Sequence, residues 1–286
     1  MAEQNPVWFI TGCSSGFGRE IAKLLLSQGV RVAMTARKLE SLADLVAGNE
    51  ELALPLALDV NDNAQIDAAV SKAEAHFGQI DILVNNAGYG YFAAIEEGEE
   101  EEIRRQFDTN VFGLAAVTRR VLPGMRTRRS GHIINFSSIG GLTSHPALGY
   151  YCATKFAVEA ISEALSKEVA PLGIKVTLIE PSGFRTDWAG RSSVDPKVTI
   201  DDYAETAGYV RSLQHDYSGK QPGDPARLAK AVVDVSRHDN PPLRLLMGSY
   251  AYNLGMERVE ELRKTFEEWK DVTCGVDFPD ADPSAV

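Results

Sequence analysis

The strongest constraint on the fold of this chain is a regular alternation between short apolar runs and longer segments of helical periodicity. The apolar runs include VWFITG, VRVAMTAR, LALPLALDV, IDILVNNAG, GHIINFSS and IKVTLIEPSG. Helical segments separate them, among them 62–77, 99–127 and 149–170. Strands that are apolar on both faces and alternate with helices are typical of a parallel sheet covered by helices on both sides. The sequence therefore predicts a doubly wound α/β fold of the Rossmann type.

The chain is long enough for one large α/β domain, with 286 residues of which 44% are apolar. No change of composition marks a linker before about position 190. After this position the alternation of apolar runs and helical segments ends. Aromatic residues are then mixed with turn residues, as is usual in a lid or binding element. We expect one domain over residues 1–250, including a lid at about 187–225, followed by a C-terminal helical extension and tail over 251–286.

Charge and cysteine content exclude several classes of partner. A net charge of −11 disfavours nucleic acids and anionic membranes. Cys13, Cys152 and Cys274 are too few and too scattered for a disulfide framework, and no spacing suggests a metal site. The N-terminal stretch lacks a basic segment followed by a long apolar run, and no run of about 18 apolar residues occurs. These features predict a cytoplasmic protein that binds no membrane, nucleic acid or metal.

The acidic run EEGEEEE at 96–102 has two interpretations. It could bind a cation, or it could open the helix at 99–127, where carboxylates complement the positive end of the helix dipole. The second interpretation is favoured.

The turn TGCSSGFG lies between the first apolar run and the first helix. Its glycines let the backbone approach a pyrophosphate, and the amides at the helix start supply an anion site. The predicted cofactor-binding residues of this turn are Gly12, Ser14, Ser15, Gly16, Phe17 and Gly18.

The same letters also fit G-x-S-x-G, the strand–nucleophile–helix turn of serine hydrolases, with Ser14 as nucleophile. The turn would then follow the very first strand, no histidine has a persuasive triad context, and the third glycine has no role. Phosphate binding explains all three glycines, so it is favoured.

The end of the second predicted strand indicates which dinucleotide binds. There Ala36 is followed by Arg37 and Lys38, with no carboxylate for the ribose diol of NAD. A guanidinium suits a 2′-phosphate, so NADP(H) is the expected cofactor. Further predicted contacts end the next strands, where Asp59 would bond the adenine: Asp59, Val60, Asn86, Ala87 and Gly88.

Tyr151 and Lys155 are four residues apart in a predicted helix and share one face, whereas Tyr150 points roughly 100° away around the axis. A nearby ammonium favours the phenolate and lowers the pKa of a phenol. Tyr151 is therefore the candidate general acid and base, and Tyr150 is expected to pack.

At this point the chain resembles the short-chain dehydrogenase/reductase family, and within it the hydroxysteroid and retinol dehydrogenase-like members. The resemblance covers roughly residues 6–190 and rests on TGCSSGFG, NNAG, the asparagine of DTNVFG, the serine pair of NFSS and YCATK, in this order. It implies carbonyl–alcohol interconversion by hydride transfer, with Ser138 orienting the substrate oxygen, Lys155 bonding the nicotinamide ribose and Asn110 holding a water. It also implies a homodimer or homotetramer paired through the helices at 99–127 and 149–170.

The resemblance further implies cofactor contacts at Pro181, Phe184 and Thr186. The family usually has glycine after this proline, whereas this chain has Ser182. Because glycine permits backbone angles that serine resists, the contacts that follow are less secure.

Aromatic residues beside the predicted site suggest a medium or large apolar carbonyl substrate. The candidate substrate residues are His145, Phe92 and Trp188, with Tyr89, Tyr91 and Phe184 beside them. A protein that binds NADP without turnover is the alternative, and the complete set of four catalytic candidates argues against it.

Overall fold

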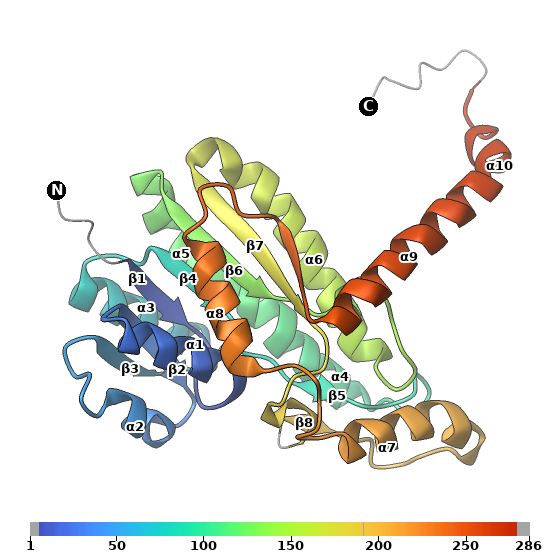
Figure 1. Cartoon of the computed structure of the whole chain (residues 1–286), viewed down its shortest axis with the longest axis horizontal. Helices are drawn as coiled ribbons and strands as arrows, with labels where there is room; N and C mark the ends of the chain where they lie inside the picture. Colours follow the sequence, from blue (N-terminus) through green and yellow to red (C-terminus); the bar gives the residue numbers. More distant parts are fainter. Residues whose placement is uncertain (1–5, 191, 279–286) are drawn as a thin grey trace.

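A seven-stranded parallel sheet forms the centre of the computed structural model, which describes residues 6–190 and 192–278 (Figure 1). The strand order is β3-β2-β1-β4-β6-β7-β9, and every neighbouring pair is parallel. The strands are β1 (Val7–Ile10), β2 (Arg31–Ala36), β3 (Ala53–Ala57), β4 (Ile82–Asn85), β6 (Gly131–Phe136), β7 (Ile174–Pro181) and β9 (Arg244–Met247). The predicted doubly wound fold is confirmed.

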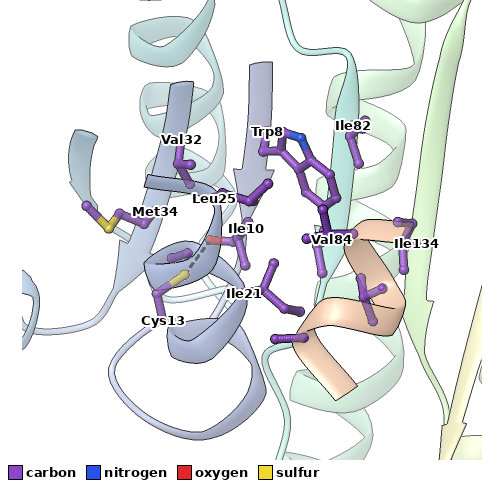
Figure 2. Close-up of a cluster of buried hydrophobic side chains, with 14 of the residues drawn as sticks. Trp8, Ile10, Cys13, Ile21, Leu25, Val32, Met34, Ile82, Val84 and Ile134 are labelled. Atoms are coloured by element: carbon purple, nitrogen blue, oxygen red, sulfur yellow. Dashed lines mark hydrogen bonds between the residues drawn. The ribbon is translucent and has the colours of Figure 1, made fainter. Parts of the chain in front are cut away.

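Three helices cover one face of the sheet: α1 (Gly16–Ser27), α2 (Ala43–Val46) and α8 (Pro225–Ser236). Figure 2 shows the core beneath them, where Ile21 and Leu25 of α1 meet Trp8 of β1 and Val84 of β4. All four side chains are fully or almost fully buried. Removal of this much apolar surface from water fixes α1 and the turn before it against the end of β1.

Three helices cover the opposite face: α3 (Asn63–Phe77), α5 (Leu114–Arg128) and α6 (Gly149–Val169). Their buried positions recur at helical spacing, for example Ile66, Ala69, Val70 and Ala73 of α3. This is the apolar stripe expected of a helix that packs on a sheet. The bounds of α3 and α6 lie within one residue of the predicted ranges.

The helix predicted over 99–127 is interrupted. It consists of α4 (Glu100–Phe107), a π-helical turn (Asp108–Gly113) and α5. Within the wide turn Asn110 exchanges two hydrogen bonds with the backbone of Tyr89, accepting from its N–H at 3.1 Å and donating to its carbonyl at 3.0 Å. The widened turn therefore brings a side chain of the helix to the chain that leaves β4, as such turns often do at functional sites.

The segment predicted as a lid forms a layer of its own beside β5 (Gly90–Tyr91) (Figure 1). β8 (Ser193–Val194) pairs with β5, and α7 (Tyr209–Asp216) follows. Short helical turns complete the elements, at Leu39–Leu42, Ile139–Gly141, Ala170–Leu172, Asp187–Ala189, Asp201–Tyr203 and Ala204–Gly208.

In the described chain two helices follow β9, in the region expected to be a C-terminal extension over 251–286. They are α9 (Ser249–Glu268) and α10 (Lys270–Cys274). Ala251, in the first turn of α9, is fully buried, and the helix then extends away from the rest of the molecule (Figure 1). Across residues 6–190 and 192–278 no helix combines the length and the apolar character needed to cross a membrane.

Candidate active site

A cavity of about 720 Å³ lies along the carboxyl edge of the sheet. Its lining includes residues that lie one or two positions beyond the ends of six strands: Gly12 after β1, Arg37 after β2, Asp59 after β3, Asn86 after β4, Ser137 after β6 and Ser182 after β7. It passes the ends of β1 and β4, which are neighbours in the sheet. From this pair the chain order of the strands runs outward in opposite directions, to β2 and β3 on one side and to β6, β7 and β9 on the other. Crevices at such a switch point are where doubly wound sheets bind nucleotides.

The turn between β1 and α1 is built for close approach of a ligand. Gly12 and Gly16 have φ of +73° and +59°, in the left-handed region that favours glycine. A Cβ on Gly18 would lie 2.6 Å from the carbonyl oxygen of Gly12, so the helix and the turn can pack only with glycine there. The side chain of Ser15 caps none of the first amides of α1, and the first turn holds no acidic residue. Those amides form an open anion site.

Two polar side chains join this turn to the end of β4. Thr11 Oγ1 accepts hydrogen bonds from the N–H groups of Asn86 and Ala87, at 2.9 and 3.0 Å. Asn86 Nδ2 donates in return to the carbonyls of Thr11 and Gly12, at 2.9 and 3.0 Å. Asn86 therefore lines the cavity while its amide nitrogen supports the turn. Thr11 is a positioning residue that the sequence argument missed, although it opens the quoted motif.

Arg37 is exposed and lines the cavity just past the end of β2. Its guanidinium makes no hydrogen bond or ion pair with any other residue that the structure describes, so it is available to an anionic ligand. Asp59 and Val60 line the same end of the cavity. Asp59 Oδ1 accepts the N–H of Asn61 at 3.0 Å, which sets its carboxylate at the end of β3.

The structure brings Ser138, Tyr151 and Lys155 together in one wall of the cavity. Ser138 Oγ accepts the N–H of Gly140 at 3.0 Å, and its hydroxyl is near enough to the Tyr151 phenol to lower the pKa of that group. Lys155 Nζ donates to the carbonyl of Phe136 at 2.8 Å and lies 5.7 Å from the centre of the Tyr151 ring. The helical spacing of four residues accounts for the last arrangement.

The protonation of Tyr151 differs from the sequence-based expectation. Burial raises the pKa of the phenol well above its ordinary value, and the nearby hydroxyl of Ser138 opposes this only in part. Burial also lowers the pKa of Lys155 to about 8, against the attraction of Glu159. The ammonium was expected to lower the pKa of Tyr151. In the protein without ligand desolvation prevails, so Tyr151 is a protonated phenol.

Asn110 adjoins the same group of side chains from the π-helical turn. Besides its bonds to Tyr89, its Nδ2 donates to Thr154 Oγ1 at 3.1 Å. A Cβ on Gly88 would lie 3.0 Å from Asn110 Oδ1 and 4.0 Å from Lys155 Nζ. Asn110 and Lys155 therefore both approach the space that a side chain at position 88 would fill.

The segment after β7 departs from expectation at Ser182. Apart from glycines, only Arg129 and Ala147 of the described chain have positive φ, so Ser182 has an ordinary backbone conformation and needs no glycine angles. Its N–H donates to the carbonyl of Met247 at 3.1 Å, which ties the segment to the end of β9. Pro181, Phe184 and Thr186 all line the cavity. The concern that serine weakens these contacts is therefore not supported by the backbone.

The three predicted substrate residues separate into two groups. His145 and Trp188 line the cavity, and the Trp188 ring lies 4.9 Å from that of Tyr151. Phe92 is fully buried and does not line the cavity. It packs behind Trp188, at 5.3 Å between ring centres, because its strand neighbour Tyr91 pairs with β8. The prediction of direct substrate contact by Phe92 is corrected to support of Trp188.

Tyr150 has the packing role expected of it. Its hydroxyl donates to the carbonyl of Ile95 at 2.7 Å, its ring stacks near Tyr91, and it does not line the cavity. Tyr89 does line it, and its hydroxyl donates to Glu102 Oε1 at 2.8 Å.

The acidic run at 96–102 opens α4, with Glu100, Glu101 and Glu102 in its first turn. Glu97 has a second function that the sequence argument missed. Its buried carboxylate accepts from Arg211 Nη1 at 2.9 Å and from the N–H of Ile200 at 2.9 Å. Arg211 belongs to α7, whose Val210, Leu213 and Gln214 line the cavity. Glu97 thus binds two residues of the lid segment. No local sequence pattern distinguishes Glu97 from its acidic neighbours.

Ser14 lines the cavity without a catalytic partner. Across the described ranges no hydrogen bond joins Ser14 to a histidine. His132 bonds Thr177 at 2.9 Å and His215 bonds Asp195 at 2.9 Å, so neither is paired with Ser14. Nothing in the described chain assembles a serine triad.

The chain matches the short chain dehydrogenase family over residues 6–197. It is 40% identical to oxidoreductase BOA17 of Botryotinia fuckeliana over 268 residues, which is 93% of this chain and 97% of that protein. It is 38% identical to the 3-ketodihydrosphingosine reductase of Bacteroides thetaiotaomicron, over 86% of this chain and 88% of that protein.

Solved structures show the same similarity. A short-chain dehydrogenase from Streptomyces avermitilis superposes with a TM-score of 0.90 at 41% identity, covering 97% of this chain and all of that one. A 3-ketoacyl-(acyl-carrier-protein) reductase from Brucella melitensis complexed with NADH has a TM-score of 0.73 at 29% identity, covering 85% and 97% of the two chains. A serine dehydrogenase complexed with NADP+ has the same TM-score and identity, covering 84% and 94%.

Proposed function

The chain belongs to the short-chain dehydrogenase family of oxidoreductases, and we propose that it is an NADP(H)-dependent enzyme that interconverts a ketone or aldehyde and the corresponding alcohol. The observation that carries this proposal is that Ser138, Tyr151 and Lys155 line one cavity, with Asn110 bonded beside them to Tyr89 and Thr154. They come from three separate parts of the chain, namely the π-helical turn, the segment after β6 and α6, so their meeting is a property of the fold.

The residues of the β1–α1 turn would hold the pyrophosphate of the cofactor, and Lys155 would bond its nicotinamide ribose. A bound NADPH would supply the hydride for the carbonyl carbon. In our proposal Ser138 orients the carbonyl oxygen, and Tyr151 donates its hydroxyl proton to that oxygen. The raised pKa of Tyr151 suits the acid role, since the phenol holds its proton until the oxygen gains charge. Asn110 would hold the water through which Tyr151 and Lys155 regain a proton.

The choice of NADP(H) over NAD(H) rests on Arg37. Its free guanidinium lies where the cavity passes the end of β2, and Ala36 occupies the last strand position. A planar cation can bind a phosphate with two parallel hydrogen bonds. Related structures contain both NADH and NADP+, so the residues of this chain carry the argument.

An apolar carbonyl compound is the proposed substrate. Six apolar side chains line the cavity near Tyr151 and the lid, namely Ile139, Leu148, Trp188, Val194, Val210 and Leu213, with polar residues such as His145, Gln214 and Gln221 between them. Apolar walls with a few polar groups suit an apolar substrate that carries a carbonyl. A relative named for a ketone reductase is in keeping with this substrate class.

The proposal is tested by measuring NADPH oxidation with a panel of ketones, aldehydes, steroids and quinones. We expect turnover of at least one apolar carbonyl, and NADPH-dependent rates above those with NADH. NADPH binding without turnover of any compound would favour the alternative of a non-catalytic NADP sensor. Labelling of Ser14 by a fluorophosphonate would favour the serine hydrolase.

We further propose that the protein is a cytoplasmic homo-oligomer. Large apolar side chains are exposed on the two helices by which pairing is expected, namely Phe112 in the π-helical turn and Phe156 and Ile161 in α6. Exposed apolar surface of this kind is typical of subunit interfaces.

A further inference from the structure

A buried acidic cluster lies directly behind the wall that holds Lys155. Glu180, at the end of β7, is fully buried, and Glu159 of α6 is 5% exposed. Arg244 of β9 lies against both, with its Nε 2.8 Å from Glu159 Oε2 and 3.8 Å from Glu180 Oε1. Its Nη2 also bonds Glu163 Oε2, at 2.7 Å, toward the surface. The proposed reaction does not use these residues directly, yet buried carboxylates are costly unless they are compensated.

The cluster holds one buried negative charge rather than two. Burial and the neighbouring carboxylate of Glu159 raise the pKa of Glu180 to about 8. Glu180 is therefore largely protonated near neutral pH, whereas Glu159 forms the short ion pair with Arg244. A buried charge that Arg244 neutralises only in part still acts on other charges through the low-dielectric interior.

Glu159 is also held in place sterically. A Cβ on Gly141 would lie 2.9 Å from Glu159 Cγ and 2.6 Å from Ser137 Oγ, so the turn after β6 packs tightly on this side chain. Glu159 follows Lys155 by four residues on α6, and the two side chains share one helix face. The carboxylate attracts the Lys155 ammonium, and this attraction opposes the loss of the charge by burial.

The charged and titratable groups around Lys155 are few. On α6 they are Tyr151, Glu159 and, further along, Glu163 with its partner Lys167. β7 contributes Glu180 and β9 contributes Arg244, while the carbonyl of Phe136 at the end of β6 accepts from Lys155 Nζ. Of these, Glu159 is the carboxylate whose attraction opposes the loss of the Lys155 charge by burial.

We propose that Glu159 is a positioning residue for Lys155. The ion pair with Arg244 and the close packing of Gly141 hold its carboxylate in place, and that carboxylate stabilises the ammonium of Lys155, which donates to the carbonyl of Phe136. The inference rests on the proposed function, in which the ammonium binds the nicotinamide ribose and takes part in proton supply. It predicts that loss of Glu159 makes Lys155 lose its proton at lower pH.

The test is an NMR titration of lysine labelled with ¹³C at Cε, with the Lys155 signal assigned by its loss in Lys155→Met. Glu159→Gln keeps the size of the side chain and removes its charge. We expect the pKa of Lys155, about 8 in the wild type, to fall by about one unit in this variant. Glu159→Asp should restore most of the difference. The matched control Glu163→Gln removes the exposed carboxylate that binds the same Arg244, and it should leave the Lys155 titration unchanged.

An unchanged Lys155 titration in folded Glu159→Gln, or an equal shift in Glu163→Gln, would overturn the inference. Should the single variant not fold, Glu159→Gln/Arg244→Gln removes both partners of the ion pair, and the Lys155 titration should again move to lower pH. A residue that only supports packing would lower stability without moving this titration. The NMR readout requires no turnover, so absence of any carbonyl substrate would count against the proposed function alone. Where a substrate is found, the alkaline limb of kcat should move together with the Lys155 titration.

Discussion

Arg37 is the residue on which the identity of the cofactor depends. It lies free and exposed at the cavity, while the neighbouring Lys38 is equally exposed but does not line it. The two residues carry the same charge one position apart. A contribution of Arg37 through direct contact can therefore be separated from a general effect of positive charge.

Arg37→Asp should weaken NADPH binding by about 10- to 100-fold, since it removes a charge-assisted hydrogen bond and adds repulsion. NADH binding should strengthen, because the new carboxylate can accept the ribose hydroxyls. Fluorescence titration of both cofactors measures the two changes. Lys38→Asp is the control and should have a much smaller effect. Equal losses for both cofactors, or equal effects of the two substitutions, would contradict the role of Arg37.

Glu180 gives the protein a pH-dependent stability. A carboxyl whose folded-state pKa is raised stabilises the fold fully below its unfolded value, about 4.5, and this stability is lost as pH rises through about 8. Glu180→Gln keeps the neutral hydrogen-bonding form at every pH. Its free energy of unfolding should therefore increasingly exceed that of the wild type between about pH 5 and about pH 9, by an amount of the order of a few kcal/mol.

Urea unfolding at several pH values measures this difference. A constant difference across that range would show that Glu180 does not change its protonation on unfolding.

At the scale of elements, a buried ion pair joins α7 to the body beside the cavity. Arg211 of α7 bonds Glu97 and the carbonyl of Phe92, and the neighbouring Val210 packs against Ala94 and Ala147. Both charged side chains are largely buried, so the pair is much less screened than a surface ion pair. α7 supplies part of the substrate wall and lies away from the β1–α1 turn.

Arg211→Met should loosen this wall and raise KM for an apolar carbonyl roughly 10-fold, because the bound geometry is less well ordered. The Kd of NADPH should remain close to that of the wild type. Steady-state kinetics and cofactor titration measure the two quantities. Arg227→Met is the matched control, since it removes an exposed ion pair with Asp224 and should change neither. A parallel loss of NADPH affinity would contradict a role confined to the substrate side.

The elements with strong periodicity could be predicted from the sequence, and long-range contacts could not. The range of α6 was predicted within one residue because its apolar spacing and its position between two strands agree. The widened turn at Asn110 was missed, since it depends on hydrogen bonds to Tyr89, which is distant in sequence. The buried position of Phe92 and the ion pair of Glu97 were missed for the same reason: each is set by the lid folding back onto β5.

The four catalytic candidates were proposed because their types and order are distinctive; in the structure Ser138, Tyr151 and Lys155 line one cavity, and Asn110 is bonded beside them to Thr154. The direction of the pKa shift of Tyr151 could not be predicted. It depends on how completely the phenol is buried, and a pair of residues at helical spacing does not contain that information.

At the scale of the whole molecule, the cavity and the exposed apolar side chains are formed by different residues. The carboxyl edge bears the cavity, and the outer faces of the π-helical turn and α6 bear exposed apolar side chains. Burial of Phe112 and Phe156 against a second copy would remove apolar surface from water at about 25 cal/mol per Å². This is the physical basis of the proposed homo-oligomer.

Phe112→Ser/Phe156→Ser should reduce the mass measured by size-exclusion chromatography with light scattering, from an oligomer toward a single chain. Val198→Ser is the control, because Val198 is similarly exposed but lies in the lid. A wild-type protein that is already monomeric, or an oligomer unaffected by the double substitution, would contradict pairing through this face.

Tyr151 is the residue through which cofactor, substrate and proton supply are joined in the proposed reaction. Tyr151→Phe removes one hydroxyl from a buried ring and leaves its packing against Trp188 in place. The most direct measurement compares this variant with the wild type in single-turnover NADPH oxidation, using a carbonyl compound that the wild type reduces, alongside the Kd of NADPH. We predict that the rate falls by about 100-fold or more while the Kd is nearly unchanged. Turnover by Tyr151→Phe at the wild-type rate would contradict the assignment of Tyr151 as the proton donor.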